Sequence, residues 1–318
     1  MTAVCARLLE PGEWAGRRTV FEQTNENDVC GEQKMQKVVM DAEKTISAMA
    51  LEALKRIEAA AGKRAEEISG ELLLGAIPAP GGALALGDDD YPYALRTLVD
   101  PPEVIAWTGD LTLLERELSV SIVGSRDATP ERCAAAKALA RNLAERGALI
   151  VSGLAAGIDR AAHEGALDAR SGDRAGRTVA VLGTPLKSIW PPMNVELGAR
   201  IAKEGLLLSE VAQLAALVAK DDERAAALKR RNRIVAALGL GSVVMAARKG
   251  SSTLIEARAS LAIGHPVLIW HEAAGDDWAR EWIAENPKND EGEALIHVVA
   301  SAEDVEAALS PWRRVWWL

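Results

Sequence analysis

Seven short apolar runs alternate with longer amphipathic segments over the second part of the chain. The segments between the runs, such as the Ala/Leu-rich stretch 131–147, are typical of helices closed by a glycine C-cap. Runs this rich in Val, Leu and Ile are typical of strands buried on both faces, so the alternation predicts an α/β fold in which helices cover both faces of a parallel sheet. The runs occupy residues 120–124, 148–153, 178–183, 205–210, 242–246, 266–270 and 294–299.

The first part of the chain has a different pattern. Residues 1–34 are polar without a period, whereas residues 35–69 carry apolar side chains at helical spacing, which predicts one or two amphipathic helices. The stretch AIPAPGGALALGDDDYP at 76–92 predicts a linker and a domain boundary near residue 75, because Pro, Gly and Asp are typical of turns. We therefore predict a small helical N-terminal region at 1–75, a domain at 76–310 and a tail at 311–318.

The net charge and the cysteine spacing argue against several classes of protein. The 318 residues carry a formal net charge of -9, which argues against a protein that coats nucleic acid or anionic membranes by bulk electrostatics. A phosphate ligand then needs a local positive patch. No apolar stretch approaches the roughly 18 residues of a membrane span. Cys5, Cys30 and Cys133 lack the spacing of a zinc site, so we expect free thiols, no metal, no membrane and a cytoplasmic protein.

Small and polar residues follow the first two predicted strands, at the edge where ligands of parallel sheets bind. Glycines let the backbone approach a ligand, and Arg126 offers a cationic fork for phosphate, so we interpret these loops as a phosphate-binding site. The alternative is that the glycines only close tight turns. Asp159 is either a ligand group or a brace for His163 and the arginines. The loop residues are Gly124, Ser125 and Arg126, then Ser152, Gly153, Gly157, Asp159 and His163.

Two common nucleotide patterns are missing from these loops. Neither loop matches GxGxxG, and no P-loop lysine motif follows a predicted strand. This argues against a nicotinamide dehydrogenase and against an NTPase.

The densest positive stretch is RAAALKRRNRI at 224–234, which contains no acidic residue. Such a run is often a solvated helix face. Here the apolar IVAAL after Asn232 favours a helix whose N-terminal end points its arginines into the ligand cleft.

Six segments follow one another in an order that resembles one known family, DprA, also called Smf, the DNA-processing proteins of natural transformation. The resemblance covers about residues 86–309 and implies an extended Rossmann-like fold, single-stranded DNA as ligand, a homodimer, and hand-over of the DNA to the RecA recombinase. The segments are GDDDYPYALRTLVDPPEVIAWTGD (87–110), VGSRDATPE (123–131), IVSGLAAGIDRAAHEGAL (150–167), VAVLGTPLKSIWPPMN (179–194), LLLSE (206–210) and RRNRIVAAL (230–238).

The resemblance also implies site residues. It puts the arginine of the Gly-Ser-Arg motif at Arg126, the SGLAxGID loop at 152–159 and the RNR pair at Arg231 and Arg233. The expected DNA- and phosphate-binding residues are Gly124, Ser125, Arg126, Ser152, Gly153, Gly157, Lys187, Arg230, Arg231, Asn232 and Arg233.

The chain departs from the family pattern in several places. Leu228-Lys229 stands where Phe-Pro is usual, and Trp190-Pro191 replaces Tyr-Pro. No helix-hairpin-helix or winged-helix pattern is recognisable, so we expect a divergent member.

One departure from the family pattern concerns a candidate catalytic residue. Thr253-Leu254-Ile255-Glu256 resembles the Thr-x-x-Glu of the Lonely Guy phosphoribohydrolases, which implies a glutamate that assists cleavage of an N-glycosidic bond. The alternative, which we favour, is a solvent-facing Glu256 or one paired with Arg258 or Lys249.

The tail PWRRVWWL places three tryptophans around two arginines. Trp312, Trp316 and Trp317 could stack on bases beside Arg313 and Arg314, or the tail could pack on the sheet edge or at a dimer interface. We favour packing.

These patterns together predict a single-stranded DNA-binding protein of the DprA type, which protects the strand and loads a RecA-type recombinase in transformation or recombination. We expect no enzyme activity and no cofactor. The alternatives are a nucleotide sensor or phosphoribohydrolase-like enzyme that uses Glu256, and an adaptor whose N-terminal helices and tail recruit a partner.

Overall fold

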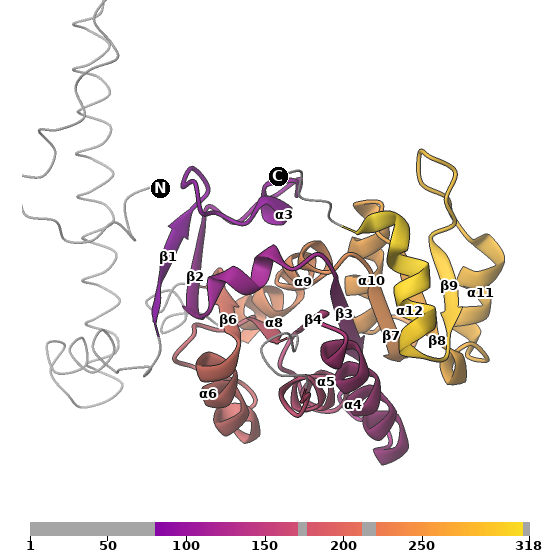
Figure 1. Cartoon of the computed structure of the whole chain (residues 1–318), viewed down its shortest axis with the longest axis horizontal. Helices are drawn as coiled ribbons and strands as arrows, with labels where there is room; N and C mark the ends of the chain where they lie inside the picture. The colour runs from indigo at the N-terminus through magenta and orange to yellow at the C-terminus, as the bar shows by residue number, and fades with distance from the viewer. Residues whose placement is uncertain (1–79, 171–176, 212–220, 314–318) are drawn as a thin grey trace, which may run out of the picture. The chain divides into compact units, whose positions relative to one another are not determined.

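The computed structural model describes residues 80–170, 177–211 and 221–313. The helices predicted within 35–69 and the tail residues 314–318 lie outside this part of the chain. In the described residues, nine strands form one sheet in the order β1-β2-β6-β5-β4-β3-β7-β8-β9 (Figure 1). The strands are β1 Gly81–Ala85, β2 Val104–Gly109, β3 Ser119–Gly124, β4 Leu149–Ser152, β5 Thr178–Leu182, β6 Leu206–Ser209, β7 Ser242–Ala246, β8 Val267–Trp270 and β9 Ile296–Val299.

The seven predicted strands correspond to β3 through β9, and they pair with one another in parallel throughout. The predicted parallel sheet is confirmed, and at one edge β1 and β2, which were not predicted, extend it in the antiparallel direction beyond β6. β1 lies in the stretch that we interpreted as a linker. Its two glycines, Gly81 and Gly82, lower its strand propensity, and the pairing with β2 overrides that local preference.

Helices cover both faces of the sheet, as predicted. One face packs against α3 (Tyr93–Arg96), α9 (Asn232–Leu238), α10 (Ser252–Ala262) and α11 (Asp277–Glu285). The opposite face packs against α4 (Pro130–Glu145), α5 (Ile158–Leu167), α6 (Val195–Glu204) and α12 (Ala302–Leu309). The remaining described helices are α8 (Asp221–Arg230) and the 3-10 helices η2 (Leu111–Glu115), η4 (Pro192–Asn194), η5 (His271–Ala273) and η6 (Ser310–Trp312).

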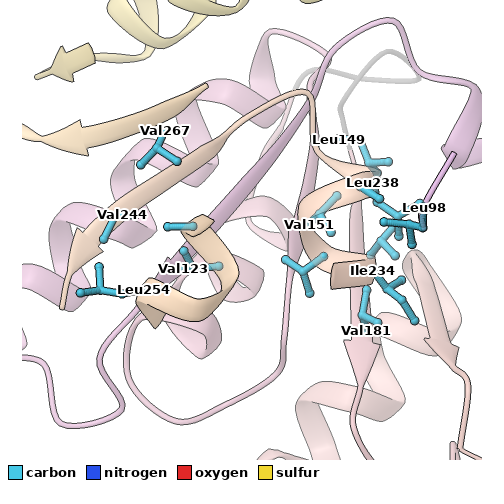
Figure 2. Close-up of a cluster of buried hydrophobic side chains, with 14 of the residues drawn as sticks. Leu98, Val123, Leu149, Val151, Val181, Ile234, Leu238, Val244, Leu254 and Val267 are labelled. Atoms are coloured by element: carbon cyan, nitrogen blue, oxygen red, sulfur yellow. The ribbon is translucent and has the colours of Figure 1, made fainter. Parts of the chain in front are cut away.

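The alternation of side chains along each strand builds two cores. In β5, Val179 and Val181 point to the α9 face, whereas Ala180 and Leu182 point to the α6 face. Figure 2 shows the first core, in which Ile234 and Leu238 from α9 pack over Val151 and Val181. Each such side chain contributes about 1.5–3 kcal/mol when fully buried, so the apolar contacts fix how the helices sit on the sheet.

The first strand-to-helix connection folds as its sequence predicts. Thr129 caps α4, with its Oγ1 accepting a hydrogen bond from the Arg132 N–H at 3.4 Å, and Pro130 occupies the first turn. At the other end Gly147 has a φ of 93°, the left-handed conformation that suits a glycine after a helix. The parallel strands therefore deliver their following loops to a common edge, which we call the carboxyl edge. None of the described helices is long and apolar enough to cross a membrane.

Candidate functional site

A cavity of about 460 Å³ opens at the carboxyl edge. Its wall comes from four connections: β3 to α4, β4 to α5, α8 to α9, and β7 to α10. The lining residues are Val123, Gly124, Ser125, Arg126, Asp127, Gly153, Ala155, Asp159, Ala225, Leu228, Lys229, Arg231, Asn232, Val235, Arg248, Ser251, Ser252, Thr253 and Glu256.

The cavity brings together about half of the residues expected to bind phosphate. Gly124, Ser125, Arg126, Gly153, Arg231 and Asn232 line it. Ser152, Gly157, Lys187, Arg230 and Arg233 are not part of its lining.

The Gly-Ser-Arg loop is held in place so that Arg126 faces outward. The N–H and the hydroxyl of Ser125 both donate to the carbonyl oxygen of Ala246, at 2.9 and 3.3 Å. Gly157, at a φ of 75°, lies directly against the Ser125 and Arg126 backbone, where a Cβ would not fit. The Arg126 side chain is exposed, and within the described residues it makes no hydrogen bond or ion pair. Its guanidinium is therefore available to an anion.

Arg231 has a different place from the one expected of a surface cation. The chain turns at Arg231 between α8 and α9, and the side chain enters the protein, where it is 5% exposed. Its Nη1 donates to the Val181 carbonyl at 2.8 Å. A Cβ at Gly153 would overlap the guanidinium, so the glycine at this position makes room for the arginine.

Two buried carboxyls accompany Arg231. Asp159 accepts a hydrogen bond from the Ala155 N–H at 3.3 Å, and Glu256 accepts one from the Ser242 hydroxyl at 2.7 Å. Burial raises the pKa of Asp159, whereas Arg231 and the backbone N–H groups oppose that rise. Burial also lowers the pKa of Arg231, and the two carboxyls oppose that shift.

Burial changes the protonation state of Glu256 at neutral pH. Burial, with Asp159 adding to it, raises the pKa of Glu256 to about 8 against the opposing effects of Ser242 and Arg231. The side chain is therefore protonated at neutral pH. Its Oε2 has no hydrogen-bond partner among the described residues. Our expectation that Glu256 faces solvent is wrong, since it is 2% exposed.

The two residues that we considered as partners of Glu256 interact elsewhere. Lys249 forms an ion pair with Glu281 at 2.8 Å, and the guanidinium of Arg258 lies over the Trp282 ring at 5.5 Å from its centroid.

The protonation state of Glu256 affects the net charge of the cavity lining. Four cations line it, namely Arg126, Lys229, Arg231 and Arg248. Of its three acids, Asp127 is paired with Arg248, and Glu256 is neutral. A cavity with more cations than ionised acids favours an anionic ligand.

The basic residues beside Arg231 on α8 and α9 fall into two groups, those that pair with Glu210 and one that is exposed at the cavity. Arg233 donates from both terminal nitrogens to the carboxylate of Glu210, at 2.7 and 2.8 Å, and Arg230 reaches the same carboxylate at 3.3 Å. These arginines tie the helix turn to the end of β6. Lys229, by contrast, is exposed at the cavity and has no ion pair within the described residues.

The other expected residues have structural contacts. The Ser152 hydroxyl donates to the Ile122 carbonyl at 2.6 Å and is fully buried. The Asn232 amide donates to the Ser252 carbonyl at 3.0 Å, which ties α9 to the start of α10. Lys187 is exposed on the connection between β5 and α6.

His163 is a buried neutral base. Its Nδ1 lies 2.7 Å from the Thr178 hydroxyl, which itself donates to the Ile150 carbonyl at 2.8 Å. That hydroxyl therefore accepts from Nδ1–H. Burial and the nearby Arg231 lower the pKa of His163 to about 3.

Arg248 and Asp127 were not among the expected site residues. Arg248 follows β7 by two residues, and Asp127 follows the Gly-Ser-Arg motif directly. The rule that ligands bind at the carboxyl ends of strands, applied to β7 as it was to β3, would have found Arg248.

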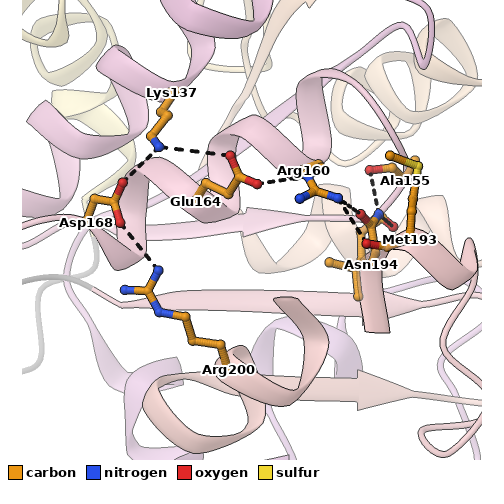
Figure 3. A network of polar contacts seen from close by, with 9 residues as sticks. Lys137, Ala155, Arg160, Glu164, Asp168, Met193, Asn194 and Arg200 are labelled. Carbon is orange, nitrogen blue, oxygen red and sulfur yellow. Dashed lines mark hydrogen bonds and ion pairs between the residues drawn. The ribbon is translucent and has the colours of Figure 1, made fainter. Parts of the chain in front are cut away.

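The connection between β5 and α6 is anchored to the cavity wall (Figure 3). The amide of the buried Asn194 donates to the carbonyl oxygens of Leu154 and Ala155, at 2.9 and 3.2 Å. Leu154 has a φ of 59°, an uncommon conformation for a residue with a side chain, and the Asn194 bond stabilises the loop in it. Arg160 donates to Asn194 Oδ1 at 3.1 Å and to the carbonyl of Met193 at 3.0 Å.

The described part of the tail packs against the domain. Trp312 donates from its indole nitrogen to the Gly264 carbonyl at 2.9 Å and contacts the core beside α12. This agrees with the packing alternative for Trp312, while Trp316 and Trp317 lie outside the described residues.

Comparison with known sequences gives a consistent result. The family model described as DNA recombination-mediator protein A matches residues 82–292. The DNA processing protein DprA of Bacillus subtilis is 31% identical over 196 residues, which cover 62% of this chain and 62% of that protein. Protein Smf of Synechocystis is 40% identical over 174 residues, 54% of this chain and 41% of that protein. The chain thus spans less than two thirds of these curated relatives.

Comparison with solved structures gives the same family as the comparison of sequences. DprA of Streptococcus pneumoniae aligns with a TM-score of 0.59 at 29% identity, covering 77% of this chain and 78% of that one. DprA of Helicobacter pylori, described for its unique single-stranded DNA binding mode, aligns with a TM-score of 0.61 at 26% identity, covering 75% and 99%.

Proposed function

Because the chain belongs to the DNA recombination-mediator protein A family, also known as DprA or Smf, we propose that it binds single-stranded DNA at the carboxyl-edge cavity. The observation that carries the proposal is the pair of exposed cations at the cavity, Arg126 after β3 and Lys229 in the last turn of α8, which have no ion pair within the described residues. The described binding mode of the Helicobacter relative supports the choice of ligand.

The proposed contacts follow from the charges of the wall. One phosphate lies on the Gly124–Arg126 loop, where the Arg126 guanidinium binds it, and the next contacts Lys229. The neutral Glu256 does not repel the strand, and Arg231 contributes positive potential from below the surface. Half or more of the contacts in such interfaces go to the backbone, so binding tolerates many sequences.

The test is a binding titration with a labelled single-stranded oligonucleotide and its duplex. Arg126→Ala and Lys229→Ala each remove an exposed cation, and we expect each to weaken single-strand binding without lowering the melting temperature. Arg146→Ala is the matched control, because Arg146 follows the far end of α4 and pairs there with Glu303 and Glu306. Equal affinity for the duplex, or full binding by Arg126→Ala, would contradict the proposal.

The wider role is also a proposal. The matched family is described as a recombination mediator, and we propose that this chain passes its bound strand to a RecA-type recombinase, in the cytoplasm and as a homodimer. Light scattering of the purified full chain tests the dimer. Assembly of recombinase on strands preloaded with this protein tests the hand-over.

One observation favours a second candidate function, a nucleotide hydrolase. Glu256 lines the cavity, is protonated at neutral pH and has an Oε2 without a partner in the described residues, as a general acid requires. The reaction would split the N-glycosidic bond of a nucleoside monophosphate with water, giving free base and sugar phosphate. Release of base by the wild type that is lost in Glu256→Gln would establish it, and no release by either form would exclude it.

A further inference from the structure

Three exposed apolar side chains lie on the connection between β5 and α6 and at the first residue of α6. Trp190, Met193 and Val195 are 57%, 62% and 50% exposed, and we call them the Trp190 platform. Among the tryptophans in the described residues, Trp190 alone is exposed. An indole held in water forgoes the burial that stabilises the others, so a bound partner is the natural explanation for its place.

Hydrogen bonds hold the backbone of the platform at Met193 and the neighbouring Asn194. Figure 3 shows Arg160 donating to the Met193 carbonyl and to Asn194 Oδ1, while Glu164 fixes Arg160 by an ion pair of 2.8 Å. Asn194 in turn bonds the carbonyl of Ala155, a residue of the cavity wall. The exposed side chains therefore stand on a connection that is already ordered, which lowers the entropy cost of binding.

The platform lies close to the cavity along the carboxyl edge. Asn194, the residue after Met193, donates to the carbonyl of Ala155 at 3.2 Å, and Ala155 lines the cavity. A single strand that lies in the cavity against Ala155 therefore passes beside the β5 connection.

We propose that the indole of Trp190 stacks on a base of the bound single strand, flanked by Met193 and Val195. This inference rests on the proposed function. The indole presents a flat π-face, which every base can stack on, and the exposed Lys187 lies three residues away. Three side chains within residues 190–195 supply too little area for a stable protein interface, which needs about 1,000 Å² or more.

The test separates bases from backbone. Binding is measured by anisotropy with an intact oligonucleotide and with an abasic one of the same length, which keeps the sugar-phosphate chain. We expect Trp190→Ala to weaken binding of the intact strand about 5- to 150-fold and to leave abasic binding unchanged. Trp190→Phe should retain most of the affinity, whereas Trp190→Leu should behave like Trp190→Ala. Val298→Ala, at an exposed position on β9, is the control.

Each other result has a definite meaning. If the wild type binds neither oligonucleotide, the proposed function fails. If the wild type binds and Trp190→Ala binds the intact strand equally well, the stacking inference alone is overturned. Equal losses on intact and abasic strands, or a change of oligomeric state in Trp190→Ala, would also overturn it, because the side chain would then support the fold or a second copy.

Discussion

The buried Glu256 gives a prediction about stability and pH. Its pKa is about 8 in the folded protein against an ordinary 4.5, so between these values the folded state holds a proton that the unfolded chain has released. Stability from this group is fully present below pH 4.5 and is lost as pH rises toward 8. At about 1.4 kcal/mol for each pH unit, the loss is about 3 kcal/mol at pH 7 and about 5 kcal/mol at pH 9.

Glu256→Gln removes this penalty. The amide oxygen still accepts from the Ser242 hydroxyl, and the amide carries no charge at any pH. We expect the variant to match the wild type at pH 4.5 and to exceed it by the amounts above at pH 7 and 9, as measured by urea unfolding followed by circular dichroism. Glu281→Gln, on the surface beside Lys249, should change stability by less than about 1 kcal/mol at each pH. A variant less stable than the wild type at pH 8 would refute the reasoning, because it would mean that Glu256 is ionised and paired with Arg231.

Two further substitutions test the support of the cavity. Arg231→Met removes the positive charge that offsets the burial of Asp159 and removes the donor to the Val181 carbonyl, so we expect a loss of about 3–5 kcal/mol in urea unfolding, partly restored by adding Asp159→Asn; an unchanged stability would show that Arg231 does not stabilise the buried carboxyl. Gly153→Ala places a Cβ on the Arg231 guanidinium, and we expect a lower melting temperature than for Gly87→Ala, whose Cβ meets no neighbour; equal melting temperatures would argue against the packing described.

The fold could be predicted wherever burial leaves a local pattern. β3 through β8 are apolar runs buried on both faces, and such runs are read directly from the sequence, as is the apolar edge strand β9. β1 begins with Gly81 and Gly82 and is largely exposed, so its local pattern is that of a turn and only its pairing with β2 makes it a strand.

The site could be predicted in part. The Gly-Ser-Arg loop follows a strand directly, so Arg126 was assigned to the carboxyl edge from its position alone. The sequence could not show that Arg231 lines the cavity whereas Arg233 does not, because this depends on where α8 ends and α9 begins. The same holds for Glu256, whose environment is set by Ser242 on β7 and by Arg231 from another connection.

The salt dependence of single-strand binding tests the central claim most directly. Each phosphate contact to a single strand adds about 0.7 to the slope of log affinity against log salt. We expect a steep fall in affinity for the wild type and, for the double variant Arg126→Ala with Lys229→Ala, a slope smaller by about 1.4, while Arg146→Ala keeps the wild-type slope. A double variant with the same slope as the wild type would contradict the account, because the strand would then lie elsewhere than on the carboxyl-edge cavity.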